Sequence, residues 1–226
     1  MPHFDIVKKN EPEITFRVSK VQADFDVKAE HSCEHFEGDI DLSKSWQIGV
    51  IVGASGTGKT TIAKELFDAE LIKGFDYSAK SVIDDMPQGI AVGDITKMFY
   101  SVGFGSVPSW LKPYSVLSNG EKMRVDLARA LLEKDFIVFD EFTSVVDRNV
   151  AQTASLAISK AIRAQENKKF IAVSCHYDIL EWLQPDWIFD TNEMKFSFMT
   201  AHELKSSLKS ESAKEASGRS LENIII

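Results

Sequence analysis

The stretch that decides the fold is Gly53-Ala54-Ser55-Gly56-Thr57-Gly58-Lys59-Thr60, which matches the phosphate-loop pattern GxxxxGK[ST]. It follows the apolar run Ile48–Val52. Glycines let backbone N–H groups turn towards the α- and β-phosphates of a nucleotide. Lys59 can then reach the β- and γ-phosphates, and the Thr60 hydroxyl can ligate Mg²⁺. We therefore predict nucleotide binding by residues 53–61, which include Thr61.

Two carboxylates stand where a nucleotide site would need them. Asp140 and Glu141 follow the apolar run Phe136–Phe139, and ligands bind beyond the carboxyl ends of parallel strands. Asp140 is predicted to hold Mg²⁺ through water, and Glu141 to polarise the attacking water. Adjacent acids after a strand also begin helices, so it is the upstream phosphate loop that favours a catalytic interpretation.

Short apolar runs alternate with amphipathic stretches over most of the chain. A third run lies at Phe170–Val173, and Ile188-Phe189 and Phe196–Phe198 are predicted to be closing strands. Helices are predicted between the runs, at Lys59–Ala69, Asn119–Leu132 and Arg148–Ala164. This alternation predicts an α/β fold with a mainly parallel sheet. The phosphate loop within it makes this a P-loop NTPase core.

The two ends of the chain have other patterns. Glu13–Val21 alternates apolar and polar side chains, as a half-buried strand does. We predict antiparallel strands with polar turns up to Ser45, which would form an N-terminal β subdomain. Lys205–Ser220 is rich in Ser, Lys and Glu, so residues 205–226 are predicted to form a polar, flexible tail.

A third motif distinguishes among the many folds that carry a phosphate loop. Residues 117–121, Leu-Ser-Asn-Gly-Glu, precede a predicted helix and resemble the LSGGQ signature of ATP-binding-cassette (ABC) ATPases. Asn119 replaces a glycine of that signature, and Glu121 replaces its glutamine. Residues 144–147 resemble the D-loop of the family, and His176 resembles its switch histidine. Ser-x-x-Glu is also a capping box, which is compatible with an anion site at the same helix end.

The resemblance implies an ATPase that works as a pair of copies. ATP would lie between the phosphate loop of one copy and the signature of the other, in a head-to-tail dimer. Ser118 and Gly120 would contact the γ-phosphate across that interface. The resemblance also implies catalytic roles for Glu141 as general base, for His176 as a γ-phosphate contact and for Lys59 as a phosphate ligand.

Further site residues are expected from the same resemblance. Gln88 is the candidate for the family's Q-loop glutamine, which contacts nucleotide and metal. The expected ligands of Mg²⁺ are Thr60, Asp140 and Gln88. The family also stacks an aromatic side chain on adenine from upstream of the phosphate loop, and the candidates here are His31, Phe36 and Phe25.

The resemblance covers about Ile40 to Asp190, and we assign residues 1–204 to one ABC-type ATPase domain. Its insert at 88–117 is shorter than the helical subdomain that receives the membrane subunit in transporters. One or two short helices and a loop are predicted there, with the aromatic side chains in the core. Parts of the chain resemble stand-alone soluble ABC-type ATPase modules of bacteria and phages, some of which are fused to acetyltransferase-like domains.

The composition of the chain limits the kinds of partner and the cellular setting that can be expected. The chain has 226 residues and a net charge of -8, which disfavours a general nucleic-acid binder without excluding a local basic patch. No apolar run approaches the roughly 20 residues of a membrane-spanning helix. The two cysteines, Cys33 and Cys175, form no CxxC pair, so a reduced, cytoplasmic setting is expected.

The leading hypothesis is a soluble ABC-type ATPase that binds and hydrolyses Mg·ATP. It would form an ATP-dependent homodimer and do conformational work on an unidentified macromolecular partner. The first alternative is the ATP-binding subunit of a membrane ABC transporter. The second is an ATP-gated clamp on DNA or another macromolecule.

Overall fold

The computed structural model describes residues 3–10, 14–26 and 32–199. The predicted tail at 205–226 lies outside the described residues. Within them, no helix is both long and apolar enough to cross a membrane.

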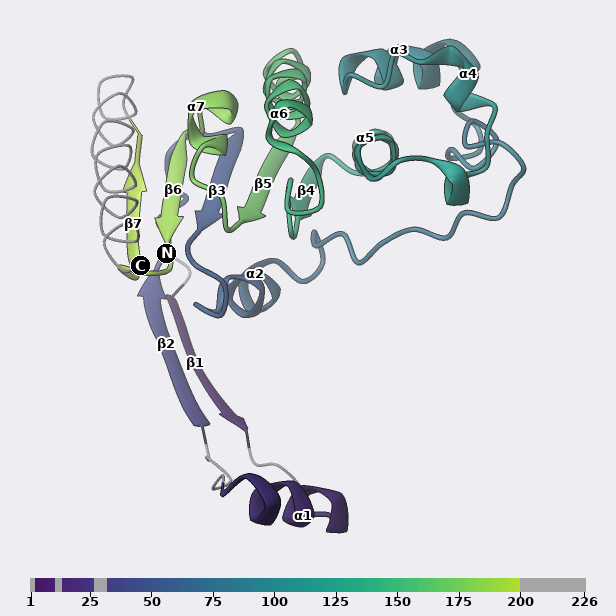
Figure 1. Ribbon diagram of the computed structural model, residues 1–226. Helices are drawn as coiled ribbons and strands as arrows, with labels where there is room; N and C mark the ends of the chain where they lie inside the picture. Colours follow the sequence, from purple (N-terminus) through teal and green to yellow (C-terminus); the bar gives the residue numbers. More distant parts are fainter. Residues whose placement is uncertain (1–2, 11–13, 27–31, 200–226) are drawn as a thin grey trace, which may run out of the picture.

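A five-stranded sheet forms the centre of the molecule (Figure 1). Its strands lie in the order β4 (Phe136–Phe139), β5 (Lys169–Ser174), β3 (Ile48–Val52), β6 (Trp187–Asp190) and β7 (Lys195–Phe198). The first four are parallel, and β7 pairs antiparallel with β6 at one edge. The predicted α/β fold with a mainly parallel sheet is confirmed.

The central strand β3 is apolar because it is covered on both faces. Ile48, Val50 and Val52 belong to a core with α3 (Val92–Ser101), α5 (Asn119–Glu133), α6 (Arg148–Arg163) and α7 (Ile179–Leu183). Ile51 points to the other face, into a core with α2 (Lys59–Phe67) and Trp187. Successive strand residues face opposite ways, so a run without polar positions is what a strand between two layers requires.

The N-terminal segment forms a two-stranded antiparallel arm, β1 (His3–Asn10) paired with β2 (Ser32–Asp39). Figure 1 shows this arm leaving the body beside α2, with α1 (Phe16–Phe25) at its far end. Phe4 and Phe36 fix the base of the arm, since both side chains are buried in the core that contains α2.

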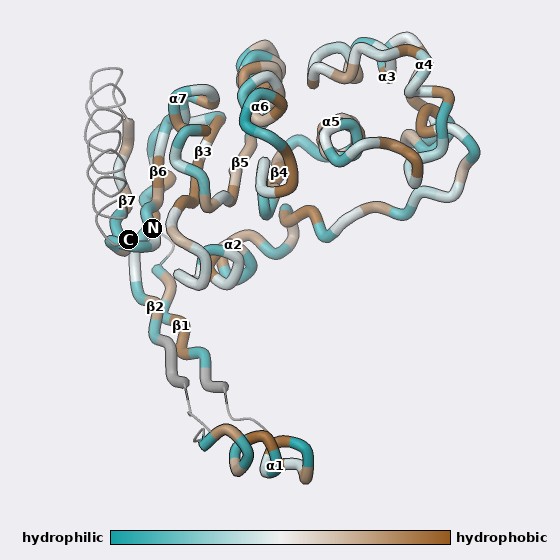
Figure 2. Tube along the Cα trace, in the orientation of Figure 1, coloured by the Kyte–Doolittle hydropathy of each residue, from teal (hydrophilic) through white to brown (hydrophobic). Residues whose placement is uncertain are grey.

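The strand predicted at Glu13–Val21 is wrong, because most of this segment lies in α1. Thr15 caps the helix, with its hydroxyl accepting a hydrogen bond from the Val18 amide at 3.2 Å. No residue of α1 is buried, and Phe16 and Phe25 are 84% and 72% exposed. Alternating apolar residues predict a strand only where a core covers one face. Without that cover the local cap decides the structure. Figure 2 shows apolar positions along this uncovered helix.

The region 88–117 contains α3, α4 (Val107–Trp110) and the short 3₁₀ turn η1 (Tyr114–Val116). Phe99, Phe104 and Trp110 are buried together, and the Trp110 indole donates to the Phe104 carbonyl at 2.8 Å. Tyr100 differs, since it is 58% exposed. Figure 1 shows α3 and α4 beyond α5, on the side of the sheet away from α2.

Gly49 in β3 tests how tightly the sheet is packed. A Cβ atom there would lie 2.1 Å from the Trp187 ring, which is fully buried. We expect Gly49→Ala to lower the free energy of unfolding by about 1–3 kcal/mol, as overpacked cores do. Urea denaturation followed by circular dichroism measures this.

The matched control is Gly93→Ala in α3, where a Cβ would meet nothing within 4 Å. That variant should be neutral or stabilised by up to about 1 kcal/mol, because alanine favours helix. Equal stability of the two variants would contradict the packing argument.

Candidate functional site

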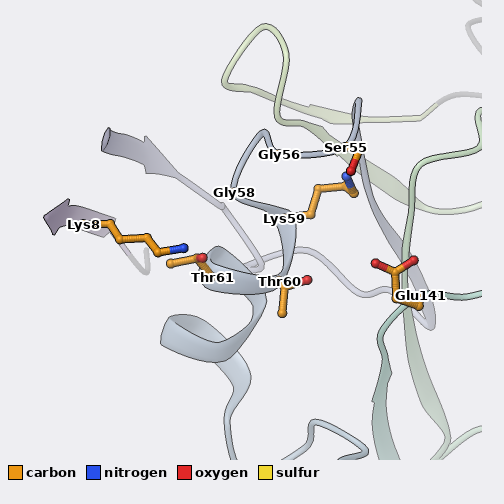
Figure 3. A pocket seen from close by; sticks show the side chains of 8 residues that line it. All are labelled: Lys8, Ser55, Gly56, Gly58, Lys59, Thr60, Thr61 and Glu141. Atoms are coloured by element: carbon orange, nitrogen blue, oxygen red, sulfur yellow. The ribbon is translucent and has the colours of Figure 1, made fainter. Parts of the chain in front are cut away.

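The phosphate loop joins β3 to α2 and opens into a pocket. Gly56 and Gly58 both have φ of 85°, a backbone region that strongly favours glycine. The pocket is lined by eight residues, shown in Figure 3: Lys8, Ser55, Gly56, Gly58, Lys59, Thr60, Thr61 and Glu141. The helix α2 begins at Lys59, so its free N–H groups and positive end face the same space.

Lys59 is buried, and its ammonium donates to the Ala54 carbonyl within the loop at 2.6 Å. Residues that follow β6 also hold the phosphate loop in place. The Ala54 amide donates to the Asn192 side chain at 3.0 Å, and the Thr57 and Thr191 hydroxyls lie 2.5 Å apart. Thr191 and Asn192 follow β6, and sequence reasoning missed both because no local pattern links them to residues so far away in the chain.

Glu141 is the residue that brings a carboxylate to the phosphate loop. It lines the pocket with Lys59 and Thr60, and its carboxylate points towards the loop in Figure 3. Its φ is 53°, in the left-handed region, and its amide donates to the Asp140 carboxylate at 2.9 Å. Backbone conformations of this kind cost roughly 1–3 kcal/mol and tend to occur at functional sites.

Hard oxygen donors are the ligands that Mg²⁺ prefers. Thr60 and Glu141 supply such donors in the pocket, and Asp140 precedes Glu141 in the chain. Among the described residues, no group of three or more His, Cys, Asp or Glu side chains forms a metal cluster. The donors present therefore fit a Mg²⁺ ion that takes its other ligands from phosphate and water, and they do not form an all-protein cage.

Gln88 is not brought to this pocket. It is exposed in the turn that leads into α3, and it is not among the lining residues. The role of Gln88 as the third Mg²⁺ ligand therefore stays a prediction.

His176 follows the end of β5 and is half-buried. Its amide donates to the Ser174 hydroxyl at 3.1 Å. Burial lowers the pKa of His176, and the nearby Arg148 guanidinium lowers it further, against the opposing charges of Asp178 and Glu141. The imidazole is therefore predominantly neutral at pH 7, able to donate from one nitrogen and accept at the other.

The signature residues begin α5. Ser118 caps the helix in a capping box, with its hydroxyl accepting from the Glu121 amide at 3.3 Å and its own amide donating to the Glu121 carboxylate at 2.9 Å. The Ser109 hydroxyl in α4 donates to the other Glu121 oxygen at 2.7 Å. Hydrogen bonds from Ser109 and Ser118 lower the pKa of Glu121, so it is a carboxylate turned back into its own chain.

Ser118 and Gly120 do not line the phosphate-loop pocket of their own chain. A Cβ on Gly120 would lie 2.9 Å from the Val150 side chain, so this glycine also lets α5 approach α6. Asp147 caps α6 by accepting from the Asn149 and Val150 amides, both at 3.0 Å.

Of the three aromatic candidates, the two that the structure describes, Phe36 and Phe25, do not line the pocket. Phe36 is buried beneath the loop, 2.5 Å from where a Cβ on Gly58 would lie. Phe25 is exposed on α1 at the far end of the arm, and His31 lies outside the described residues.

Lys8 lines the pocket, and sequence reasoning missed it. The alternation of Phe4, Ile6 and Lys8 on one strand could have indicated it.

The lowered pKa of His176 has a consequence for stability. The unfolded chain binds the proton more readily, so stability present above the ordinary value of about 6.5 is lost as the pH falls below it. We expect His176→Gln to lose less stability than the wild type between about pH 7.5 and about pH 5.5. Urea midpoints at both pH values check this, and equal losses in the two proteins would contradict it.

Three comparisons with known proteins bear on this geometry. No family model matches the chain. The energy-coupling factor transporter ATP-binding protein EcfA1 of Staphylococcus aureus strain USA300 is 27% identical over a match covering 63% of this chain. The same match spans 66% of that relative, slightly less than two thirds of its length. The EcfA1 protein of strain MSSA476 is 28% identical with the same coverage.

Solved structures show the same fold. A dimeric bacterial ABC transporter cassette matches 74% of this chain and 93% of its own, with a TM-score of 0.56 and 13% identity. A dimeric ATP-binding cassette in a post-hydrolysis state, bound to ADP and Pi, matches 77% and 95%, with a TM-score of 0.57 and 13% identity. The chain is thus similar in sequence to ATP-binding proteins of a transporter, and it has the fold of ABC ATPase cassettes, as the ordered motifs predict.

Proposed function

We propose that this chain binds and hydrolyses Mg·ATP as one half of a head-to-tail dimer. The observation that carries the proposal is a single pocket in which Lys59, Thr60 and Glu141 converge from two separate elements. A cation, a hydroxyl ligand and a carboxylate base around a helix N-terminus are the parts that phosphoryl transfer to water needs. ATP is therefore the substrate, and ADP and phosphate are the products.

Each residue has one task in this proposal. The loop amides and Lys59 hold the phosphates, and Glu141 accepts a proton from the attacking water. His176, neutral at pH 7, donates a hydrogen bond to the γ-phosphate. Mg²⁺, held by Thr60 and by Asp140 through water, would neutralise charge on the phosphate oxygens.

The dimer follows from where the signature lies. Ser118 and Gly120 are not among the residues that line the phosphate-loop pocket of their own chain, which supports a second copy as the source of the signature. Two of the structural neighbours are dimeric cassettes, which supports the same arrangement here. Ser118 already bonds to Glu121, and the serine hydroxyl would have to exchange that partner for a γ-phosphate oxygen as the dimer closes.

Among the possible settings we propose the ATP-binding subunit of a membrane transporter, at the cytoplasmic face. The curated relatives are ATP-binding proteins of a transporter, which favours this setting over a free-standing ATPase acting on another macromolecule. In this proposal the transport path belongs to a separate membrane subunit. The compact insert with exposed Tyr100 is the segment available to receive it.

Replacing the proposed base tests the mechanism. We expect Glu141→Gln to reduce ATP turnover by about 10²–10⁴-fold, the usual contribution of a general base. It should also hold ATP unhydrolysed and convert monomer to dimer only when Mg·ATP is present. Phosphate release and light scattering after size exclusion measure the two effects.

Glu65→Gln, at an exposed position of α2, is the matched control and should behave as the wild type. Full turnover by Glu141→Gln would remove Glu141 from the base role. A variant that binds ATP yet stays monomeric would mean that closure requires another chain.

A second experiment tests whether the chain works as a subunit of a membrane transporter. The Glu141→Gln chain, tagged and expressed in its native host, should be recovered with membranes and enriched for one multi-span protein. Recovery without a membrane protein would contradict the transporter setting. ATP turnover stimulated by DNA, with steep loss in salt, would favour a clamp instead.

A further inference from the structure

The phosphate-loop pocket has two ends with different charged groups. Glu141 lies at one end, close to Thr60. Lys8 enters from the other end, and Figure 3 shows its ammonium beside Thr61, on the opposite side of the loop from Glu141. A nucleotide bound here would therefore meet a carboxylate at one end and a second cation at the other.

The chemistry of hydrolysis decides which end of the nucleotide faces Lys8. Water attacks the terminal phosphate, so that phosphate must lie at the Glu141 end if Glu141 is the base. The phosphate chain then runs along the loop towards Thr61. The phosphate joined to the ribose consequently lies at the Lys8 end.

The position of Lys8 is set by a packed strand. Side chains on β1 alternate, so Lys8 faces the same way as Phe4 and Ile6. Phe4 is 2% exposed and sits in the core with α2, so this face of the arm is turned towards the body. Phe36, opposite Ile6 in β2, packs under Gly58 of the loop itself. The arm and the loop are thus one packed unit, with Lys8 just beyond the last core contact.

We propose that Lys8 binds the ribose-linked phosphate of the nucleotide, so that the N-terminal arm forms one wall of the binding site. The ligand class is a nucleoside diphosphate or triphosphate, held by Lys59 from the loop and by Lys8 from the arm. This inference rests on the proposed function, because it takes the orientation of the nucleotide from the role of Glu141.

ADP binding by calorimetry tests the proposal. Lys8→Met should weaken ADP binding about tenfold, as loss of a hydrogen bond to a charged group does, and Lys8→Arg should restore most of it. With ATP, Lys8→Met should raise KM by a similar factor and leave kcat nearly unchanged, because ADP and ATP share the contact. The salt dependence of ADP binding should also become shallower.

Two controls separate a nucleotide contact from a structural one. Lys64→Met removes the same charge from an exposed position of α2, outside the pocket, and should bind ADP as the wild type does. Glu34 is the register partner of Lys8 in β2. If Lys8 served only a cross-strand ion pair, Lys8→Met and Glu34→Gln would lower the melting temperature alike and leave ADP affinity unchanged.

Wild-type ADP affinity in Lys8→Met would overturn the inference and leave the proposed function standing. Failure of the wild-type chain to bind ADP at all would overturn both. A tenfold loss in Lys8→Met that Lys8→Arg repairs, with Lys64→Met unaffected, supports the arm as part of the nucleotide site.

Discussion

The burial of β3 between two parallel neighbours is the constraint on which the site depends. All five of its residues are buried, with β5 paired on one side and β6 on the other. The Asp186 carboxylate accepts the Gln47 and Ile48 amides at 2.7 and 2.9 Å, and Arg163 donates to the same oxygen at 2.8 Å. The start of β3 is thereby tied to the start of β6 and the end of α6, and the phosphate loop takes its position from a strand that has no freedom to shift.

A second set of contacts ties the signature helix to the rest of the molecule. The Tyr77 and Tyr114 hydroxyls donate to the two oxygens of the Asp126 carboxylate on α5, at 2.7 and 2.8 Å. Burial raises the pKa of Asp126, although the two phenols partly offset the effect. Tyr77 comes from the segment between α2 and the insert, and Tyr114 from the end of the insert. A movement of either segment would therefore pull on Asp126 and shift α5, the helix that begins with the signature.

Much of this arrangement could be predicted from the sequence, because it depends on patterns of neighbouring residues. Glycine spacing after an apolar run predicts the phosphate loop, and carboxylates after another run predict the place of Asp140 and Glu141. The helix at Asn119 follows from its capping box. Each of these signals depends on residues within a few positions of one another, and the sheet topology then brings the strand ends together.

Sequence reasoning missed features that depend on contacts between residues far apart in the chain, or on whether a core covers one face of a segment. Thr191 and Asn192 brace the loop from more than 130 positions away, and nothing in their own neighbourhood indicates it. Glu13–Val21 has the alternation of a strand but no core to cover it, so Thr15 begins a helix instead. Gln88 was predicted from its order in the chain alone, and it is not among the residues that line the phosphate-loop pocket.

Gly58 satisfies two unrelated demands at once. Its φ of 85° disfavours any side chain, and the space where a Cβ would go is filled by the Phe36 ring of the arm. Relieving one demand leaves the other in force, so a smaller residue at position 36 does not make position 58 permissive. Position 58 is therefore expected to stay glycine among chains that keep this architecture, even in those where the residue at position 36 is smaller.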